Sequence, residues 1–211
     1  MTLVVVMVAS CSSSHSGESL TPRITDPNSS GSPLNDMLLT TADLRSISGL
    51  PADMQAVSVN DLSLFADPDP RGPCGAKVQQ PDLGGGAGTG IQSPSLQGAE
   101  FVVPLEESVA RAYLSALIAD TRAGCASHTS LTNNGTQQSV ELLHVVGLPD
   151  LADQQTATVL GITNQGQRFE GAEVVLRKGG TIAFVVVFGV TAPSDSIIVA
   201  IAQKAADRLT G

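Results

Sequence analysis

Residues 172–190 read AEVVLRKGGTIAFVVVFGV, and this stretch decides the fold. Two segments rich in β-branched residues, 172–177 and 181–190, flank Lys178-Gly179-Gly180, which is typical of a hairpin turn. The run from Ile182 to Val187 is apolar without interruption. It therefore predicts a central strand that is covered on both faces, in an antiparallel sheet.

Five further strands are expected elsewhere in the chain. The clearest pair flanks Asn133-Asn134-Gly135, a strong signal for a β-hairpin turn. The five segments are 55–59, 96–103, 126–132, 136–146 and 156–163.

The clearest helix is predicted from Pro104 to Ala123. Pro104 can occupy its first turn, where the missing N–H costs nothing. Glu106 and Glu107 lie near the positive end of the helix dipole and point apart, so they are interpreted as dipole partners, not as an acid/base pair. The expected buried face consists of Val109, Ala112, Tyr113, Ala116 and Leu117.

A shorter helix is expected within 34–47, and a last one at about 194–209. The candidate capping residues are Thr40 or Thr41 for the first and Ser194 or Asp195 for the last. The buried face of the last helix is expected to contain Ile198, Ile201, Ala202, Ala205 and Leu209. Helices packed on one antiparallel sheet make the fold class α+β.

The segment 66–95 is expected to be irregular, because it contains many Pro and Gly residues. Its run Gly84–Gly90 lacks the Gly-Lys-Ser/Thr of a phosphate-binding loop, so we interpret it as a flexible loop. Asp67-Pro68-Asp69-Pro70 offers too few ligands for calcium and is read as a turn.

The N-terminus resembles a bacterial lipoprotein signal. Residues 2–9 are uncharged and mostly apolar, too short to span a bilayer, and Val8-Ala9-Ser10-Cys11 resembles the lipobox. The resemblance implies cleavage after Ser10 and a diacylglycerol on Cys11 that anchors the chain to the outer face of the cell membrane. No Lys or Arg precedes the apolar run, so we expect the natural start to lie upstream.

Three parts of the chain follow from this pattern. Residues 1–10 are the expected signal peptide, with its start truncated, and 11–33 are expected to form a flexible tether rich in Ser, Thr, Pro and Gly. Residues 34–211 form the expected extracellular domain.

The composition excludes several classes of partner. The chain has 211 residues and a net charge of −9, so it would repel the phosphates of nucleic acids. It contains no Trp and one Tyr, which argues against aromatic platforms for bases or sugars.

Cys74 and Cys125 are expected to form a disulfide, because Cys11 accounts for the odd cysteine and an exported chain meets an oxidising exterior. The alternative is a zinc site made of both cysteines with His128 and His144. No second closely spaced ligand pair is present, so no metal is expected.

The lipobox, the opening Leu38-Leu39-Thr40-x-x-Asp43-Leu44, Pro73-Cys74, Tyr113 in a helix, and Cys125 after that helix together resemble the PknH-like extracellular domain. That family occurs in mycobacterial lipoproteins and as the outer sensor domain of receptor Ser/Thr kinases. The resemblance covers roughly Leu34 to Leu209 and implies an antiparallel sheet with helices around a ligand-binding cleft. This chain lacks the family's second disulfide and its Trp before the helix-end cysteine, since residues 121–124 read Thr-Arg-Ala-Gly.

The sequence favours a binding role over chemistry. No Gly-x-Ser-x-Gly elbow is present, and both His128 and His144 are interpreted as strand residues. We therefore expect no enzyme and no cofactor, and a cleft for a small apolar or amphipathic ligand with Asp67–Pro94 as a mobile rim. The alternatives are a structural or interaction protein of the envelope, or a hydrolase with a site assembled from scattered residues.

Lipidation of Cys11 leads to a direct expectation. With an upstream start restored, the wild-type chain should enter the detergent phase on phase separation, whereas Cys11→Ala should stay in the aqueous phase, because each buried CH₂ contributes ~0.8 kcal/mol to anchoring. Equal partition of the two proteins would contradict the lipobox interpretation.

Overall fold

The computed structural model describes residues 33–58, 85–124, 128–131, 137–164 and 166–209. Within these ranges, eight strands form one antiparallel sheet in the order β1-β2-β3-β8-β7-β6-β5-β4. The strands are β1 Gln55–Ser58, β2 Ala87–Gln92, β3 Leu96–Pro104, β4 His128–Leu131, β5 Gln137–Val145, β6 Gln154–Asn164, β7 Gln167–Lys178 and β8 Thr181–Gly189. The helical elements are the 3-10 turn η1 Asn35–Met37 and the helices α1 Thr41–Ser46, α2 Glu107–Arg122 and α3 Asp195–Arg208.

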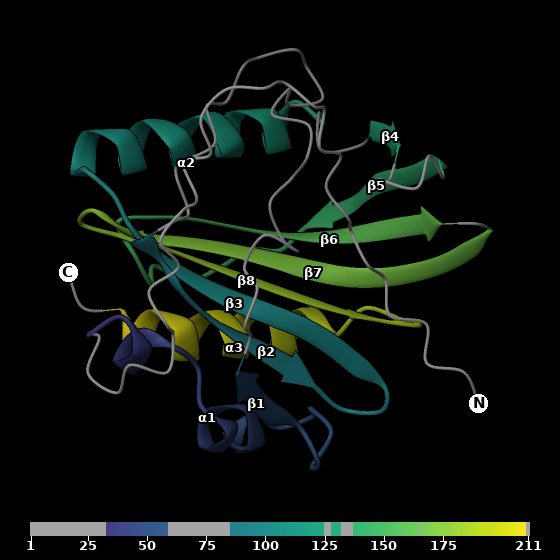
Figure 1. Cartoon of the computed structure of the whole chain (residues 1–211). Coiled ribbons are helices and arrows are strands. Elements are labelled where there is room, and N and C mark those ends of the chain that lie inside the picture. Colours follow the sequence, from purple (N-terminus) through teal and green to yellow (C-terminus); the bar gives the residue numbers. More distant parts are fainter. Residues whose placement is uncertain (1–32, 59–84, 125–127, 132–136, 165, 210–211) are drawn as a thin grey trace, which may run out of the picture.

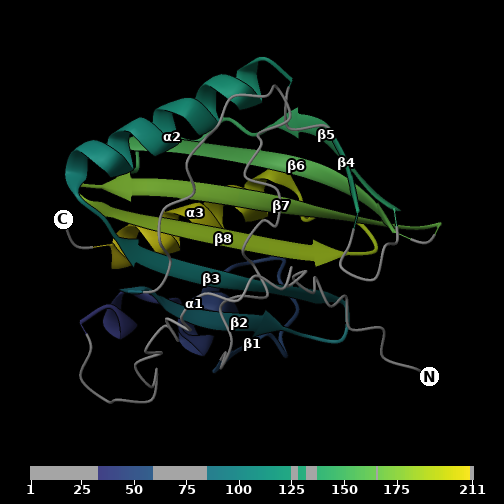
Figure 2. The same ribbon diagram turned by 45° about the horizontal axis from the view of Figure 1, so that its top comes forward.

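Helices cover both faces of the sheet (Figure 1). α3 packs on β7 and β8, and α1 packs on β1, while α2 crosses β6, β7 and β8 on the opposite face. Figure 2 shows α3 behind the strands and α2 in front of them. The α+β class expected from the sequence is confirmed. No described helix is both long and apolar enough to cross a membrane.

β8 is the central strand that its apolar run predicts. It pairs with β3 from Leu96↔Gly189 to Pro104↔Thr181, and with β7 on its other edge. Its alternate residues enter different cores. Ala183, Val185 and Val187 belong to the large cluster under α1 and α3, whereas Ile182 packs in the small cluster under α2. The uninterrupted apolar run therefore reflects burial on both sides.

The predicted hairpin between 172–177 and 181–190 is confirmed, although β7 begins earlier, at Gln167. Lys178 pairs with Thr181 across the two-residue turn, and Gly179 has a φ of 56°. A left-handed residue at this point is typical of the primed turns that match the twist of paired strands, and glycine adopts it without a Cβ clash.

The other predicted strands are also found. β4 pairs with β5, β5 with β6, and β1 with β2, all antiparallel. The bounds differ from the predicted ones by a few residues at most ends. The turn Asn133-Asn134-Gly135 lies outside the described residues.

The interpretation of Gly84–Gly90 as a flexible loop is wrong for its second half. Residues from Ala87 onward form β2, which pairs with β1 on one edge and β3 on the other. The backbone hydrogen bonds of two neighbours thus outweigh the low strand preference of glycine. Gly88 stands opposite Phe101, so the small residue leaves room for the ring on their shared face.

The predicted start of the second helix is wrong, and its predicted buried face is confirmed only at Tyr113 and Leu117. Pro104 is the last residue of β3, because it continues the pairing with Thr181, and Leu105 N–H then donates to the carbonyl of Gly180 over 2.7 Å. α2 therefore begins at Glu107, and its phase is shifted by one residue. Val109 is 47% exposed, and the side chains that face the sheet are Ala110, Tyr113, Leu114, Leu117, Ile118 and Thr121.

The first predicted helix divides into η1 and α1, and its Thr cap is confirmed. Thr40 and Asp43 form a reciprocal capping box, in which each side chain accepts from the other residue's backbone N–H. In α3 the predicted buried face is also confirmed, with Ala206 added. Ser194 holds the cap position, but its hydroxyl bonds to Ser196 and makes no cap hydrogen bond.

The close pairing of β3 and β8 can be tested at Gly98. A Cβ at this position would overlap the backbone carbonyl of Val186, so the strands would have to move apart. Gly98→Ala should lower the free energy of unfolding by about 2 kcal/mol or more, as overpacking does. Urea denaturation measures this, with Gly147→Ala as the control, because a Cβ there meets open space. Equal loss in both variants would contradict the close approach.

Candidate functional site

Two hollows open on the described surface. The larger, of about 620 Å³, lies at one end of the sheet and is lined by Asp150, Leu151, Ala152, Asp153, Lys178 and Gly179. The smaller, of about 150 Å³, lies between the C-terminal half of α2 and the strands β5 and β6. It is lined by Ile118, Thr121, Arg122, Val145, Val146, Leu148, Gln155, Thr156 and Ala157.

The charged groups of the larger hollow are already used to hold the fold. The ammonium of Lys178 donates to the carbonyls of Ala206 and Leu209, over 2.6 and 3.3 Å, and so caps the end of α3. The carboxylate of Asp153 accepts from the N–H of Gly179 over 2.8 Å. This hollow is therefore wide and polar, and two of its charged groups, Lys178 and Asp153, are bound to the backbone of the fold.

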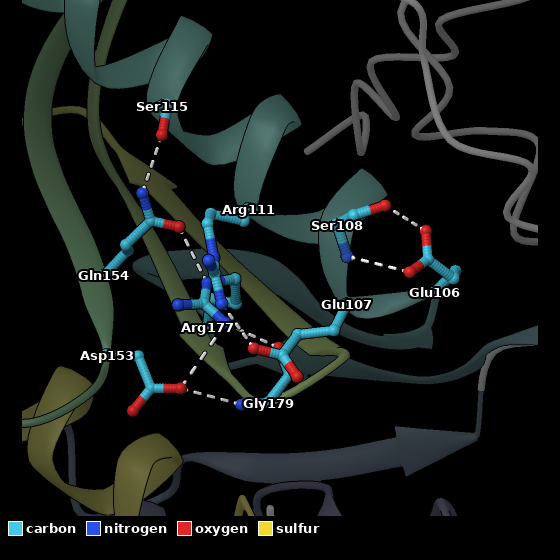
Figure 3. A network of polar contacts seen from close by, with 9 residues as sticks. All are labelled: Glu106, Glu107, Ser108, Arg111, Ser115, Asp153, Gln154, Arg177 and Gly179. Carbon is cyan, nitrogen blue, oxygen red and sulfur yellow. Dashed lines mark hydrogen bonds and ion pairs between the residues drawn. The ribbon is translucent and has the colours of Figure 1, made fainter.

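Beside this hollow, Arg177 joins three parts of the fold (Figure 3). Its side chain is only 6% exposed, and its Nε donates to the Gln154 amide oxygen over 2.7 Å. Its Nη1 donates to the Gly179 carbonyl over 2.6 Å and lies 3.4 Å from the Asp153 carboxylate. The amide of Gln154 in turn donates to Ser115 of α2 over 2.8 Å. A buried guanidinium with these partners fixes α2 to the β7–β8 turn and leaves little charge for a ligand.

The two glutamates at the start of α2 have separate partners, as predicted. Glu106 is the cap residue, and hydrogen bonds from the hydroxyl and N–H of Ser108 lower the pKa of its carboxyl. Glu107 forms an exposed ion pair with Arg111 over 2.6 Å, one helical turn away (Figure 3). Such pairs contribute little to stability.

The smaller hollow has an apolar wall. Ile118, Val146 and Leu148 contribute to it, and the side chain of Val145 is 51% exposed at its edge. The loop that carries Leu148 is held by Gln155, whose amide oxygen accepts from Leu151 N–H over 3.0 Å. The amide nitrogen of Gln155 donates to the carbonyl of Pro149. The pocket wall is therefore held in place by side-chain hydrogen bonds to the backbone.

Polar groups border the same pocket. Thr121, Thr156 and Arg122 lie among its lining residues. Arg122 occupies the last turn of α2 and is exposed, and its side chain makes no hydrogen bond or ion pair with any described residue. An apolar wall with a few convergent polar groups is the usual composition of a small-molecule site.

A buried carboxyl group, which the sequence reasoning missed, lies on the opposite face of the sheet. Glu100 of β3 is 0% exposed, and its Oε2 accepts from Leu39 N–H over 2.5 Å. Its Oε1 has no hydrogen-bond partner among the described residues. Burial raises the pKa of Glu100 to about 8, and the negative charge of Asp43 adds to this, while the Leu39 hydrogen bond and Arg208 oppose it. The signal in the sequence was a charged residue within the apolar run of β3.

Glu100 belongs to the contact that holds the N-terminal arm, residues 34–47, on the domain. Arg208 at the end of α3 reaches the carboxylate of Asp43 over 2.7 Å and the carbonyl of Asp36 over 3.3 Å. Burial on its own would raise the pKa of Asp43, but hydrogen bonds from Thr40 and the charge of Arg208 hold it below the usual value. The arm is thus attached by the Arg208–Asp43 ion pair, by hydrogen bonds from Arg208 to Asp36 and Thr40, by the buried bond to Glu100, and by its leucines.

The predicted site residues are only partly placed. Cys11, Cys74 and Cys125 lie outside the described residues, so neither the lipid site nor the disulfide is described. His144 is on β5, as predicted, and its Nε2 lies 2.9 Å from the Asp195 carboxylate at the start of α3. This exposed pair borders neither hollow. Among the residues the structure describes, no group of three His, Cys, Asp or Glu could hold a metal ion.

The fold is similar to a solved structure, the extracellular domain of PknH from Mycobacterium tuberculosis. The TM-score is 0.51 and the sequence identity 17%, and the match covers 82% of this chain and 93% of that one. At this identity the likeness concerns the fold. The expected PknH-like fold is thereby supported in its broad architecture. No family model and no curated protein matches the sequence.

The buried Glu100 makes the stability of the domain depend on pH. Its pKa is raised from 4.5 to about 8 in the fold, so the folded state binds the proton more tightly than the unfolded chain. This contribution is complete below pH 4.5 and is lost as the pH rises to about 8. Within that window the free energy of unfolding falls by at most about 1.4 kcal/mol for each pH unit.

Glu100→Gln keeps an acceptor for Leu39 N–H and removes the titration. Its free energy of unfolding should therefore fall less than that of the wild type between pH 5 and pH 8, with the variant the more stable protein at pH 8. Denaturant melts across the range measure this, with the exposed Glu107→Gln as control. Parallel curves for wild type and Glu100→Gln would show that Glu100 does not titrate in this window.

Proposed function

We propose that this chain is a cell-envelope lipoprotein whose domain is a sensor-like binding module on the outer face of the membrane. The domain would bind a small apolar or amphipathic ligand and perform no chemistry. Three observations support this: the lipobox at Cys11, a fold similar to an extracellular domain, and the pocket beneath α2.

The pocket between α2 and β5–β6 is the observation that carries the binding role. It joins apolar side chains to exposed polar ones, and the exposed Val145 at its edge is apolar surface that a ligand would cover. The cleft residues could not be named from the sequence. The structure supplies candidates, most of which lie on α2, on β5 and β6, and in the loop between these two strands.

The expected rim of the binding site is described only in part, since its residues 67–84 lie outside the described ranges. Asp67–Pro94 was expected to form it, but its described part includes β2, which is held in the sheet by two neighbours. Among the described residues, part of the edge of the pocket is formed by the segment that follows β5, with Leu148 held by the Gln155 hydrogen bonds.

The hydrolase alternative would need a histidine and a carboxylate beside a cleft. His144 and Asp195 are such a pair, and two serines lie beside Asp195 in sequence. Both side chains are exposed and lie outside the two hollows, where water has free access. Pre-organised catalytic groups act in sites that exclude water, so this arrangement favours binding without chemistry as the proposal.

Ligand binding should raise the thermal stability of the domain. The Cys11→Ala chain, which cannot carry the lipid, should show a higher Tm with at least one fraction of an envelope lipid extract. A ligand at 100 times its Kd adds ~2.7 kcal/mol, because it binds the folded state alone. Differential scanning fluorimetry measures the shift. An unchanged Tm with every fraction would favour a structural or interaction role in the envelope.

A further inference from the structure

The pocket beneath α2 is too small for a whole ligand. Its volume of about 150 Å³ compares with roughly 300–1,000 Å³ for sites that enclose drug-sized molecules. At about 30 Å³ for each water-sized group, it holds roughly five such groups. A ligand with more atoms than this must extend out of the pocket, past the residues at its mouth.

The pocket wall selects the part of the ligand that enters. Ile118, Val146 and Leu148 form an aliphatic part of the wall, and Thr121 and Thr156 add hydroxyl groups beside it. The Gln155 amide, which also lines the pocket, already bonds to Leu151 and Pro149. A polar group placed against the aliphatic wall would lose its water without gaining a partner, which costs free energy. An alkyl group gains from the same burial.

The mouth of the pocket carries a positive charge. Arg122 is a lining residue and is exposed, and no described residue satisfies its guanidinium. The chain as a whole carries a net charge of −9, so an arginine with no ion-pair partner among the described residues is notable on this surface. Guanidinium groups bind carboxylates and phosphates through two parallel hydrogen bonds.

Arg122 also lies in the last turn of α2, where a cation is favourable for the helix dipole. Any cationic side chain in the last turn would interact with the dipole in this way, whichever side of the helix it lies on. It does not account for the position of Arg122 beside an aliphatic pocket. The two roles differ in their consequence, because the dipole role affects stability and the ligand role affects affinity for anions.

We propose that this pocket takes the terminal alkyl group of an anionic amphiphile, and that Arg122 pairs with its carboxylate or phosphate. This deepens the proposed function and rests on it. About five carbon atoms fill the pocket, and the anionic group then lies at the mouth. Longer alkyl chains should bind with little additional affinity, because the added carbon atoms lie outside the pocket.

The test compares three probes that each contain eight carbon atoms and differ in their polar group. Octanoate, octyl phosphate and octanol are titrated by calorimetry into the Cys11→Ala chain, below their critical micelle concentrations. Octanoate or octyl phosphate should bind at least tenfold more tightly than octanol. The preferred anion distinguishes a fatty acid from a phosphorylated lipid as the source.

Three variants separate the contributions. Arg122→Gln should lower affinity for the anion about tenfold and leave octanol binding unchanged, which corresponds to the loss of one ion pair. Thr156→Leu should fill the pocket and abolish binding of all three probes. Lys204→Gln removes a cation on α3, across the sheet, and should change nothing. If Thr156→Leu fails to fold, Val145→Gln replaces it, because that side chain is exposed and its loss of apolar contact should weaken all probes.

Two results would overturn the proposal: equal affinity of wild type and Arg122→Gln for the anions, or no binding of any probe by the wild type. If an envelope extract still raises the Tm in the second case, the binding role stands and only this ligand class is wrong. If neither extract nor probes bind, both proposals fail.

Discussion

The burial of β8 on both faces is the constraint on which the rest of the structure depends. In a strand whose successive residues are all apolar, both faces are apolar, and neither can be left exposed to water. One set of its side chains, Ala183, Val185 and Val187, requires the cover that α3 and the N-terminal arm provide. The other set, with Ile182 and Phe184, requires α2. The order of the layers thus follows from a single apolar run.

The position of α2 over the sheet creates the pocket. Arg177 and Gln154 fix the helix near the β7–β8 turn, and Tyr113 meets Phe184 in an edge-to-face contact with 6.0 Å between ring centroids. The helix then runs toward β6 and β5, and its last turns lie beside residues of these two strands. The space between the helix end and these strands is filled only in part, and Arg122 borders it.

The face of the sheet opposite α2 contains a buried ionisable group. There the N-terminal arm, which would follow the tether, is attached over Glu100, a carboxyl group buried in an apolar cluster. A buried acid of this kind is stable only when it holds its proton, since ionisation would place a charge among leucines. The attachment of the arm and the protonation of Glu100 are therefore linked, although the pocket lies on the other side of the sheet.

Much of this architecture could be predicted from the sequence. The alternation and turn signals identified seven of the eight described strands, the Thr40 cap and the buried face of α3, because these depend on neighbours a few residues apart. The lipobox and cysteine pattern predicted an exported, anchored protein, and these stay predictions.

Other features were decided only by contacts distant in sequence. Gly88 and Gly90 became strand residues because β1 and β3 supply hydrogen bonds from both sides. Pro104 stayed extended because Thr181 lies opposite, which moved the start and the phase of α2. The pocket combines a helix end with two strands and a loop, and Glu100 is buried by an arm 61 residues away. Local sequence patterns do not encode contacts between residues that are far apart in the chain. The sequence by itself therefore determined the elements, and tertiary packing decided which of their side chains come into contact.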